Sequence, residues 1–487
     1  MSSITGSLGP VVDPTGPLGP GGRPSDTAQP QGGSRRRTEL IMLVFAFALV
    51  AFAFANVGFS LKDRLPSGLA EYMAAFIVII VIAHLAMRRF APWADPLLLP
   101  LAALLNGLGI VMMYRLGAQV NPATGNPAVA TSATSIQILF SAVGIACFVA
   151  VLAFIREPRV LQRYTYTFGA IGILLLALPA LLPDSISEVY GAKIQIAFGS
   201  FITIQPEEFA KLALAISFAG YLVAKRDVLA LAGRRVLGID LPRARDLGPI
   251  LLAWAASLLL LVFESDIGTS AVFMGLFVVM LYIATSRTSW LMLGFLMFVA
   301  GAYAASKLVA HVGERFDIWL HPFTGSNPSG NAYQLVQGLY GMASGGLLGK
   351  GLGGGQPYIT PLVQSDLVVS AFGEELGLAG LMAILLIYGL IVQRGLRTAM
   401  SVKDPFSKLL AGGLSFMLAL QVFVIVGGVT RLIPLTGITA PFLSQGGSSL
   451  VGSWMLIALL ARLSDTARRP PPRPIQEEGL TQVVTLK

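Results

Sequence analysis

The chain has 487 residues, of which 55% are hydrophobic and only 12% are charged, and its mean hydropathy is +0.74. A soluble domain carries about 25% charged residues, so this composition excludes a globule solvated by water alone and predicts a membrane protein. The formal net charge of +9 gives no support for nucleic-acid binding, because no basic stretch is interleaved with aromatic residues in a soluble segment. The single cysteine, Cys147, cannot form a disulfide within the chain.

Twelve segments are apolar enough to cross a bilayer as helices, which takes about 20 residues each. Their approximate bounds are 39–61, 67–88, 95–116, 134–155, 165–183, 206–224, 247–264, 269–286, 289–309, 367–392, 409–432 and 448–464. The flanking residues 1–37 and 466–487 cannot bury enough apolar surface to fold alone and are predicted to be disordered cytoplasmic tails. The predicted fold is an all-α polytopic membrane protein.

The distribution of Lys and Arg predicts the orientation of these helices. With the N-terminus in the cytoplasm, the inner segments hold 25 of these residues and the outer segments hold 8, while Lys211 lies within a span. Because positive residues accumulate in cytoplasmic loops, both termini are predicted to lie inside.

One predicted outer connection, residues 310–366, is much longer than the others. It contains Arg315 and also Lys350, which lies within the glycine-dense run SGGLLGKGLGGG at 344–355. Its aromatic residues and glycines favour an ordered loop on the outer membrane surface over a disordered one. The run lacks the spacing and the Ser or Thr of a nucleotide-binding loop, but its backbone amides and Lys350 could meet a lipid pyrophosphate.

The predicted span 206–224 contains ionisable residues, and charges within a span are costly. Glu208 and Lys211 belong to the sequence QPEEFAKL at 205–212, and their spacing of three residues places them on one helix face. Two interpretations stay open: a buried ion pair that holds helices together, or a pair that faces a substrate.

Further acidic residues occur near the predicted outer face. Asp266 lies in a sharp turn, where it either caps the next helix or belongs to a site. Asp366 closes the long loop, as a helix cap or as a general base at the membrane boundary. Glu374 and Glu375 follow on the same helix, about 12 Å deeper at 1.5 Å per residue. Two carboxylates at that depth need partners or water, which predicts a polar cavity under Asp366.

Four sequence blocks together resemble a known family. They are QPEEFAKL at 205–212, ESDIGT at 264–269, the loop from Tyr333 through QSDLVVSAFGEELG to Gly377, and PLTGITAPFLSQGGSS at 434–449. Their order and spacing resemble the SEDS family (shape, elongation, division and sporulation), and within it the RodA branch as found in actinobacteria. The resemblance implies a ten-helix core at 94–465, so residues 38–93 would form two additional N-terminal helices.

Members of this family are peptidoglycan glycosyltransferases of the bacterial cytoplasmic membrane. They polymerise lipid II, an undecaprenyl-pyrophosphate-linked disaccharide-pentapeptide, on the outer face, with a class B penicillin-binding protein as transpeptidase partner. The resemblance implies the same activity here, in cell elongation.

The resemblance also carries over individual residues. Asp366 matches the family's essential acid, Glu208 and Lys211 match the acid and the lysine of its QPSEFAKL block, and Asp266 matches the aspartate of its PDLGT block. Ser448, in the last block, is expected to contact substrate.

Some positions depart from the family pattern. Gln445 stands where a Tyr is usual, Glu207 replaces a Ser, and 193–195 read Lys-Ile-Gln where many members have an Arg-Trp pair. These departures concern substrate contacts and leave the acid in place.

The expected reaction is inverting glycosyl transfer with Asp366 as the base. Arg315, Lys350 or a divalent cation, Mg²⁺ or Mn²⁺, would offset the charge of the leaving pyrophosphate. Three alternatives stay open: a lipid II flippase whose pathway uses the intramembrane acids and Lys211, an FtsW-like division polymerase, and a scaffold that only recruits the penicillin-binding protein.

Overall fold

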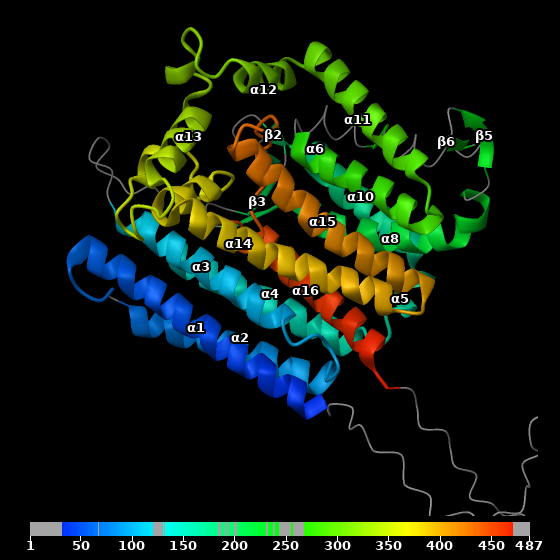
Figure 1. Ribbon diagram of the computed structural model, residues 1–487, viewed down its shortest axis with the longest axis horizontal. Helices are drawn as coiled ribbons and strands as arrows, with labels where there is room; N and C mark the ends of the chain where they lie inside the picture. The colour runs from blue at the N-terminus through cyan, green and yellow to red at the C-terminus, as the bar shows by residue number, and fades with distance from the viewer. Residues whose placement is uncertain are drawn as a thin grey trace, which may run out of the picture.

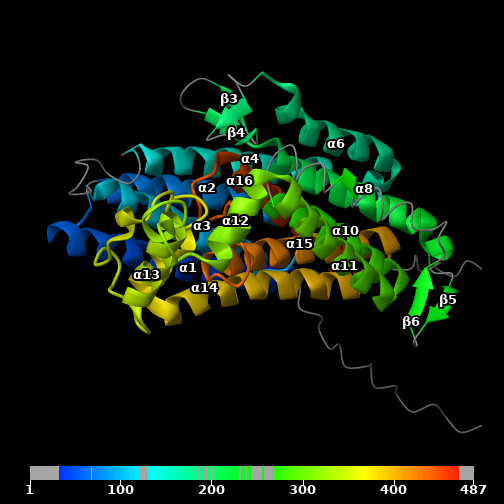
Figure 2. The same cartoon turned by 90° about the horizontal axis from the view of Figure 1, so that it is seen from above.

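The structure, a computed structural model, describes residues 32–66, 68–119, 132–183, 202–229 and 267–470, with short stretches at 130, 187–189, 192–193, 195–198, 232–236, 239–242 and 255–256. Helices dominate and run along a common direction in one bundle (Figures 1 and 2). The long helices are α1 (Gly32–Lys62), α2 (Leu69–Phe90), α3 (Leu98–Ala118), α4 (Ala133–Phe154), α6 (Thr165–Leu181), α8 (Pro206–Leu229), α10 (Ile267–Thr285), α11 (Thr288–Leu308), α14 (Val368–Ser401), α15 (Pro405–Val429) and α16 (Gly447–Arg468), and α5 (Val160–Arg163) is a single turn.

Nine of the described helices are long and apolar enough to cross a membrane. They coincide with nine of the twelve predicted spans. The apolar part of α6, Thr165–Pro179, is shorter, and α8 carries acidic residues in its first turn and Arg226 in its last. The predicted span at 247–264 lies outside the described residues except for 255–256. The count of twelve and the orientation therefore stay predictions, while the membrane-spanning class is confirmed.

The structure adds two local details to the confirmed helical class. Helix α1 begins at Gly32, so residues 32–37, predicted to belong to the tail, are helical. The connections also contain three short antiparallel strand pairs: β1 (Glu188–Val189) with β2 (Ala192–Lys193), β3 (Ile196–Phe198) with β4 (Ile202–Ile204), and β5 (Ala232–Val236) with β6 (Ile239–Pro242). A two-stranded pair is marginal by itself in water, so these hairpins depend on the helices that they connect.

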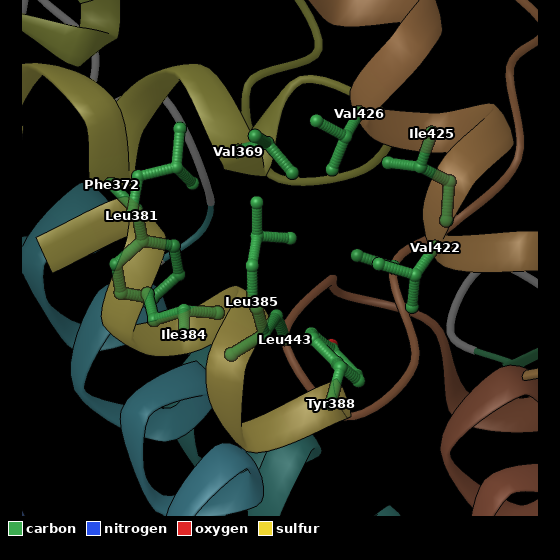
Figure 3. Close-up of a pocket in the computed structure, with 11 residues that line it drawn as sticks. Val369, Phe372, Leu381, Ile384, Leu385, Tyr388, Val422, Ile425, Val426 and Leu443 are labelled. Atoms are coloured by element: carbon green, nitrogen blue, oxygen red, sulfur yellow. The ribbon is translucent and has the colours of Figure 1, made fainter. Parts of the chain in front are cut away.

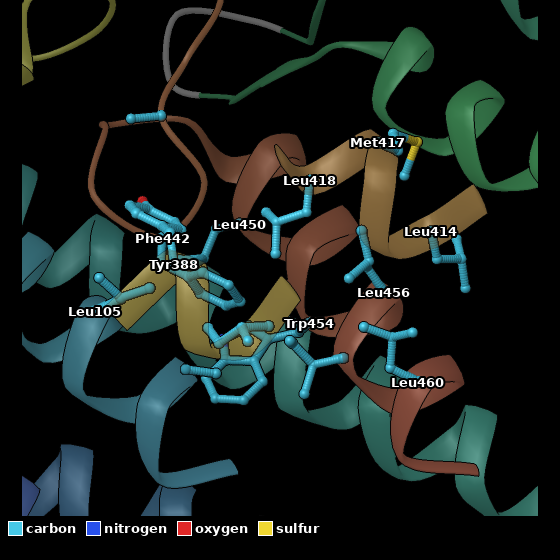
Figure 4. Packing of buried hydrophobic residues seen from close by; sticks show 14 of the residues in the cluster. Leu105, Tyr388, Leu414, Met417, Leu418, Phe442, Leu450, Trp454, Leu456 and Leu460 are labelled. Carbon is cyan, nitrogen blue, oxygen red and sulfur yellow. The ribbon is translucent and has the colours of Figure 1, made fainter. Parts of the chain in front are cut away.

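One continuous apolar cluster fills the bundle, and Figure 4 shows its part around Trp454. The indole of Trp454 is fully buried, and its Nε1 donates to Asn106 Oδ1 at 3.1 Å. Asn106 Nδ2 in turn donates to Ser141 Oγ at 3.0 Å. This chain of hydrogen bonds joins α16, α3 and α4, and it satisfies polar groups that burial would otherwise penalise.

The long connection at 310–366 is ordered, as predicted. It contains α12 (Ala310–Leu320), α13 (Tyr333–Gly345) and the single 3₁₀ turns η2 (Asn327–Ser329) and η3 (Pro357–Ile359). Helices α12 and α13 lie together at one end of the bundle (Figure 1), which we call the loop end.

Helix α14 is broken at Gly377, where φ is 68° and the backbone is not helical. Only glycine adopts this conformation without strain, and the break is also a close approach, since a Cβ at Gly377 would lie 2.3 Å from the backbone nitrogen of Gly349. Residues 368–376 thus form a separate short helix. Glu374 and Glu375 precede the break and lie on this short helix, which begins two residues after Asp366, so their depth estimated from the helical rise stays a prediction.

Candidate functional site

A polar cavity of about 560 Å³ opens beside Asp366 at the loop end of the bundle. Four segments that are distant in sequence line it: the β3–β4 region, the faces of α12 and α13, residues 362–366, and residues 435–448. The lining residues are Gln195, Thr203, Gln205, His311, Glu314, Arg315, Ile318, Asn331, Gln334, Leu335, Leu362, Gln364, Ser365, Asp366, Leu435, Gly437, Thr439, Gln445, Gly446, Gly447 and Ser448. Its size is that of a small-molecule site, and Asp366 joins it as predicted.

The Asp366 carboxylate receives two side-chain hydrogen bonds. Ser365 Oγ donates to Oδ1 at 2.7 Å, and Gln334 Nε2, from α13, approaches Oδ2 at 3.5 Å. Burial raises the pKa of the carboxyl above its ordinary value, and these donors together with nearby Arg315 oppose that shift without cancelling it. The N-cap residue of α14 is Leu367, and no side chain caps that helix. The helix-cap interpretation of Asp366 therefore finds no support, and the carboxylate faces the cavity.

Residues 440–445 hold the backbone just before Asp366. Ser444 Oγ donates to the carbonyl of Ser365 and accepts from the backbone N–H of Ala440 at 2.8 Å. The backbone N–H of Gln445 donates to the carbonyl of Gln364 at 2.7 Å. These bonds bring the fourth sequence block against the third and fix the position of the acid.

Among the described residues that line the cavity, the cationic side chain is that of Arg315. It belongs to α12, whose residues His311, Glu314 and Ile318 face the same cavity at helical spacing. Its Nη1 donates to the carbonyl of Thr436 at 3.0 Å. The bond leaves other guanidinium donors for a ligand, so the cation is held in place at the wall of the cavity that Asp366 also lines.

Ser448 lies at the start of α16 and lines the cavity, as expected from the sequence. Its Oγ accepts from the backbone N–H of Gln205 at 2.9 Å. This contact joins the first sequence block to the fourth at the cavity wall.

Glu208 and Lys211 form the ion pair that their spacing predicted. Lys211 Nζ lies 2.8 Å from Glu208 Oε1, and both side chains are buried. The same Nζ donates to Gln421 Oε1, on α15, at 3.4 Å. Neither residue lines the cavity. Of the two interpretations left open, this geometry favours the pair that holds α8 against α15.

Glu374 and Glu375 are placed away from the cavity, contrary to the idea that they deepen it. Glu375 Oε1 accepts from Arg115 Nε at 2.6 Å, and Glu374 Oε1 accepts from Lys350 Nζ at 3.0 Å. Both carboxylates also accept from backbone N–H groups of the glycine-dense run and its neighbour, those of Gly353 at 3.1 Å and Gln356 at 2.9 Å. The pair of acids anchors this loop.

Lys350 is thus engaged by Glu374 and does not line the cavity. Its proposed contact with a leaving pyrophosphate has no support from its position. Asp266, the remaining predicted site residue, lies outside the described residues.

A second hollow, between α14 and α15, is apolar (Figure 3). Its walls include Val369, Phe372, Leu381, Tyr388 and Ile425. Its accessible space is about 10 Å³, roughly one water molecule. We interpret it as a packing gap and assign it no ligand.

Sequence reasoning missed two contacts near the cavity and the glycine-dense run. Arg115 was counted only as an outer cation, although an arginine amid apolar residues at a helix end signals a buried partner. Ser444 gave no local signal, because its partner Ser365 is 79 residues away. Among the residues that the structure describes, no three His, Cys, Asp or Glu side chains are placed to share a metal ion.

Comparison with known proteins agrees with this arrangement. Residues 95–469 match the model of the FtsW, RodA and SpoVE family, described as a cell cycle protein. The chain belongs to this family. It is 48% identical to a peptidoglycan glycosyltransferase RodA of Mycobacterium tuberculosis over 445 residues, which are 90% of this chain and 92% of the relative. It is 46% identical to a protein of the same name from Mycobacterium leprae over 448 residues, 92% of this chain and 94% of the relative.

Solved structures share the fold of this family. A rod shape determining protein RodA of Thermus thermophilus aligns with a TM-score of 0.52 and 24% identity, over 78% of this chain and 98% of that chain. A chain from a peptidoglycan synthase complex that coordinates polymerization and crosslinking aligns with a TM-score of 0.58 and 24% identity, over 77% of this chain and 99% of that chain. The protein is thus a multi-pass bacterial membrane protein with the RodA fold.

Proposed function

We propose that this protein is a peptidoglycan glycosyltransferase that polymerises lipid II on the outer face of the cytoplasmic membrane during cell elongation. The observation that carries the proposal is the cavity in which the Asp366 carboxylate and the Arg315 guanidinium are both held by protein contacts. Family membership and the similarity to proteins named peptidoglycan glycosyltransferase RodA support it.

In the proposed reaction Asp366 accepts the proton of the acceptor sugar's 4-hydroxyl. That oxygen attacks the anomeric carbon of the donor from the face opposite its pyrophosphate, and the new glycosidic bond forms with inversion. The bond between the anomeric carbon and the pyrophosphate oxygen breaks, and undecaprenyl pyrophosphate leaves with the electron pair. A base must lie within hydrogen-bond reach of the hydroxyl, which the cavity position of Asp366 permits.

Arg315 is proposed to stabilise the charge that develops on the pyrophosphate. A guanidinium can donate two hydrogen bonds to phosphate oxygens in one plane, and the position of Arg315 is already fixed by Thr436.

A divalent cation that binds the pyrophosphate is a further part of the proposal. Mg²⁺ is often held by one or two carboxylates together with substrate phosphates, and Glu314 is the cavity carboxylate that would do so beside the proposed base.

The alternatives fit the geometry less well. In a flippase the four intramembrane ionisable residues would face a shared polar path, but Glu208 is paired with Lys211 and Glu375 with Arg115.

A class B penicillin-binding protein is the proposed partner, and the similarity to a chain from a peptidoglycan synthase complex supports this proposal. A role in cell division would differ from a role in elongation in which partner protein activates polymerisation.

The direct test is polymerisation of labelled lipid II by purified protein, alone and with its class B partner. Long glycan strands made by either preparation are the expected result, and parallel reactions with Mg²⁺, Mn²⁺ or EDTA test the cation. Absence of polymer in every condition, with lipid II moved across vesicles instead, would establish the flippase.

As pH is lowered, the rate of polymerisation should begin to fall at a higher pH than it would if the pKa of the base were that of a free aspartate. Only the ionised form of Asp366 accepts a proton, so activity is present above its pKa and lost as pH falls through it. Because burial raises that pKa, the acid limb should lie above pH 4, about where an unperturbed aspartate titrates. The pH profile of kcat/KM, which reports the free enzyme, measures the limb.

His311 is the control for this profile. It faces the same cavity with Glu314 and Arg315, and burial together with Arg315 lowers its pKa. The variant His311→Asn should keep the acid limb. If the acid limb disappeared in this variant, the group that titrates would be His311 and not Asp366.

A further inference from the structure

Helices α1 and α2 lie outside the part of the chain that matches the family, 95–469, yet they pack closely on it. They run alongside α3 (Figure 1), and both meet it at Gly107. A Cβ at Gly107 would lie 2.4 Å from Val50 Cγ2, on α1, and 3.2 Å from Phe76 Cε1, on α2. Any larger residue there would push the two helices off α3, so the contact depends on glycine.

At the end of the bundle away from the loops, buried charges hold the two helices to the core. Glu39, fully buried on α1, accepts from Arg36 and lies 2.7 Å, through Oε1, from Nδ1 of His84 on α2. Arg36 Nη2 donates to the carbonyl of Ala94 at 2.6 Å. Because unpaired buried charges are costly, this cluster ties α1 and α2 to the start of the family core.

At the loop end, α1 touches the glycine-dense run that precedes Asp366. A Cβ at Gly353 would lie 2.8 Å from Ser60 Cβ and 3.4 Å from the carbonyl oxygen of Val57. Gly353 has φ +91°, and its backbone N–H donates to Glu375 Oε2 at 3.1 Å. The backbone of the run is therefore held between α1 on one side and Glu375 on the other.

Glu375 and its neighbour connect this contact to the proposed base. They lie on the short helix 368–376, which begins two residues after Asp366. Arg115 bridges Glu375 Oε1 and the carbonyl of Gly355, at 2.6 Å and 2.8 Å. A displacement of the run at Gly353 would thus strain the bonds that orient the helix following the base.

We infer that the outer end of α1, at Val57 and Ser60, is a positioning surface for the loop and short helix that carry Asp366. This inference rests on the proposed function. The residues of the contact, Ser60 and Gly353, do not line the cavity, so they act through the placement of the base and not through substrate binding.

The test is Ser60→Leu, which adds bulk against Gly353 without changing the loop. Polymerisation of lipid II should show a kcat about ten-fold lower, since misplacement of a reacting group by 1 Å can cost about 100-fold, with KM close to that of the wild type. Amide hydrogen exchange across 349–357 should become faster. Ser60→Ala, which keeps the Cβ, should behave as the wild type, and so should Phe59→Leu, which places the same side chain at a half-exposed neighbouring position.

The outcomes are distinct. Faster exchange with unchanged kcat would show a contact without a positioning role, and unchanged exchange would show that α1 does not hold the loop; either overturns the inference and leaves the proposed function standing. An equal loss in Ser60→Leu and Phe59→Leu, with a lower melting temperature in both, would also overturn it in favour of a general packing effect. A wild type that makes no polymer refutes the proposed function, and the inference with it.

Discussion

The substitution Asp366→Asn should lower lipid II polymerisation by roughly 1,000-fold, within the range of about 10²–10⁴ for a general base. The amide keeps the size of the side chain, and its one oxygen can still accept from Ser365. Its NH2 group cannot accept from Gln334, and the amide cannot take the proton from the acceptor hydroxyl. Initial rates of glycan formation, with and without the class B partner, measure the loss.

A matched control separates this effect from a general change at the loop end. Asp317 is an acid of α12 that accepts from Asn327 and does not line the cavity. Asp317→Asn should polymerise at near the wild-type rate. If Asp366→Asn stayed active while folded, another group would have to be the base. If both variants were inactive, the loss would reflect a general change at the loop end and not the loss of a base.

Replacement of Arg115 should cause the second large effect, on stability. Arg115→Ala leaves Glu375 buried without its cation, and removing one partner of a buried ion pair costs about 3–5 kcal/mol. The carbonyl of Gly355 loses its donor as well. Thermal unfolding of the purified protein in detergent should show a clearly lower midpoint, with activity lost at temperatures where the wild type still works.

Two further variants identify the cause of that loss. Arg115→Leu combined with Glu375→Leu should recover part of the stability, because an apolar pair of similar volume avoids an unpaired charge. Arg159→Ala breaks a pair with Asp404 in which Arg159 is 66% exposed, and it should change stability by less than about 1 kcal/mol. A midpoint for Arg115→Ala equal to that of Arg159→Ala would contradict the buried-pair explanation.

Local sequence signals predicted those features that depend on neighbours along the chain. The apolar runs placed nine helices that the structure contains, and the spacing of Glu208 and Lys211 predicted their ion pair. The junction of loop and helix singled out Asp366. Each of these follows from helix periodicity or from the cost of burying backbone and charge in lipid.

Contacts between distant segments decided the rest. The sequence around Gly377 continues an apolar helical pattern, so it predicted one straight helix, and only the close approach of Gly349 makes a break there necessary. Glu374 and Glu375, just before the break, contact the glycine-dense loop and do not line the cavity beside Asp366. Likewise, Arg115 meets Glu375 across 260 residues, and no local pattern predicts such a partner.

The sequence by itself therefore determined the membrane class, most of the spans, the family and an acid that lines the cavity. Only the tertiary structure decided which charges share a cavity with that acid and which serve to hold loops and helices in place. The physical reason is that hydropathy and helix spacing act between near neighbours in the chain, whereas the pairing of buried charges depends on which segments folding brings within a few ångströms of each other.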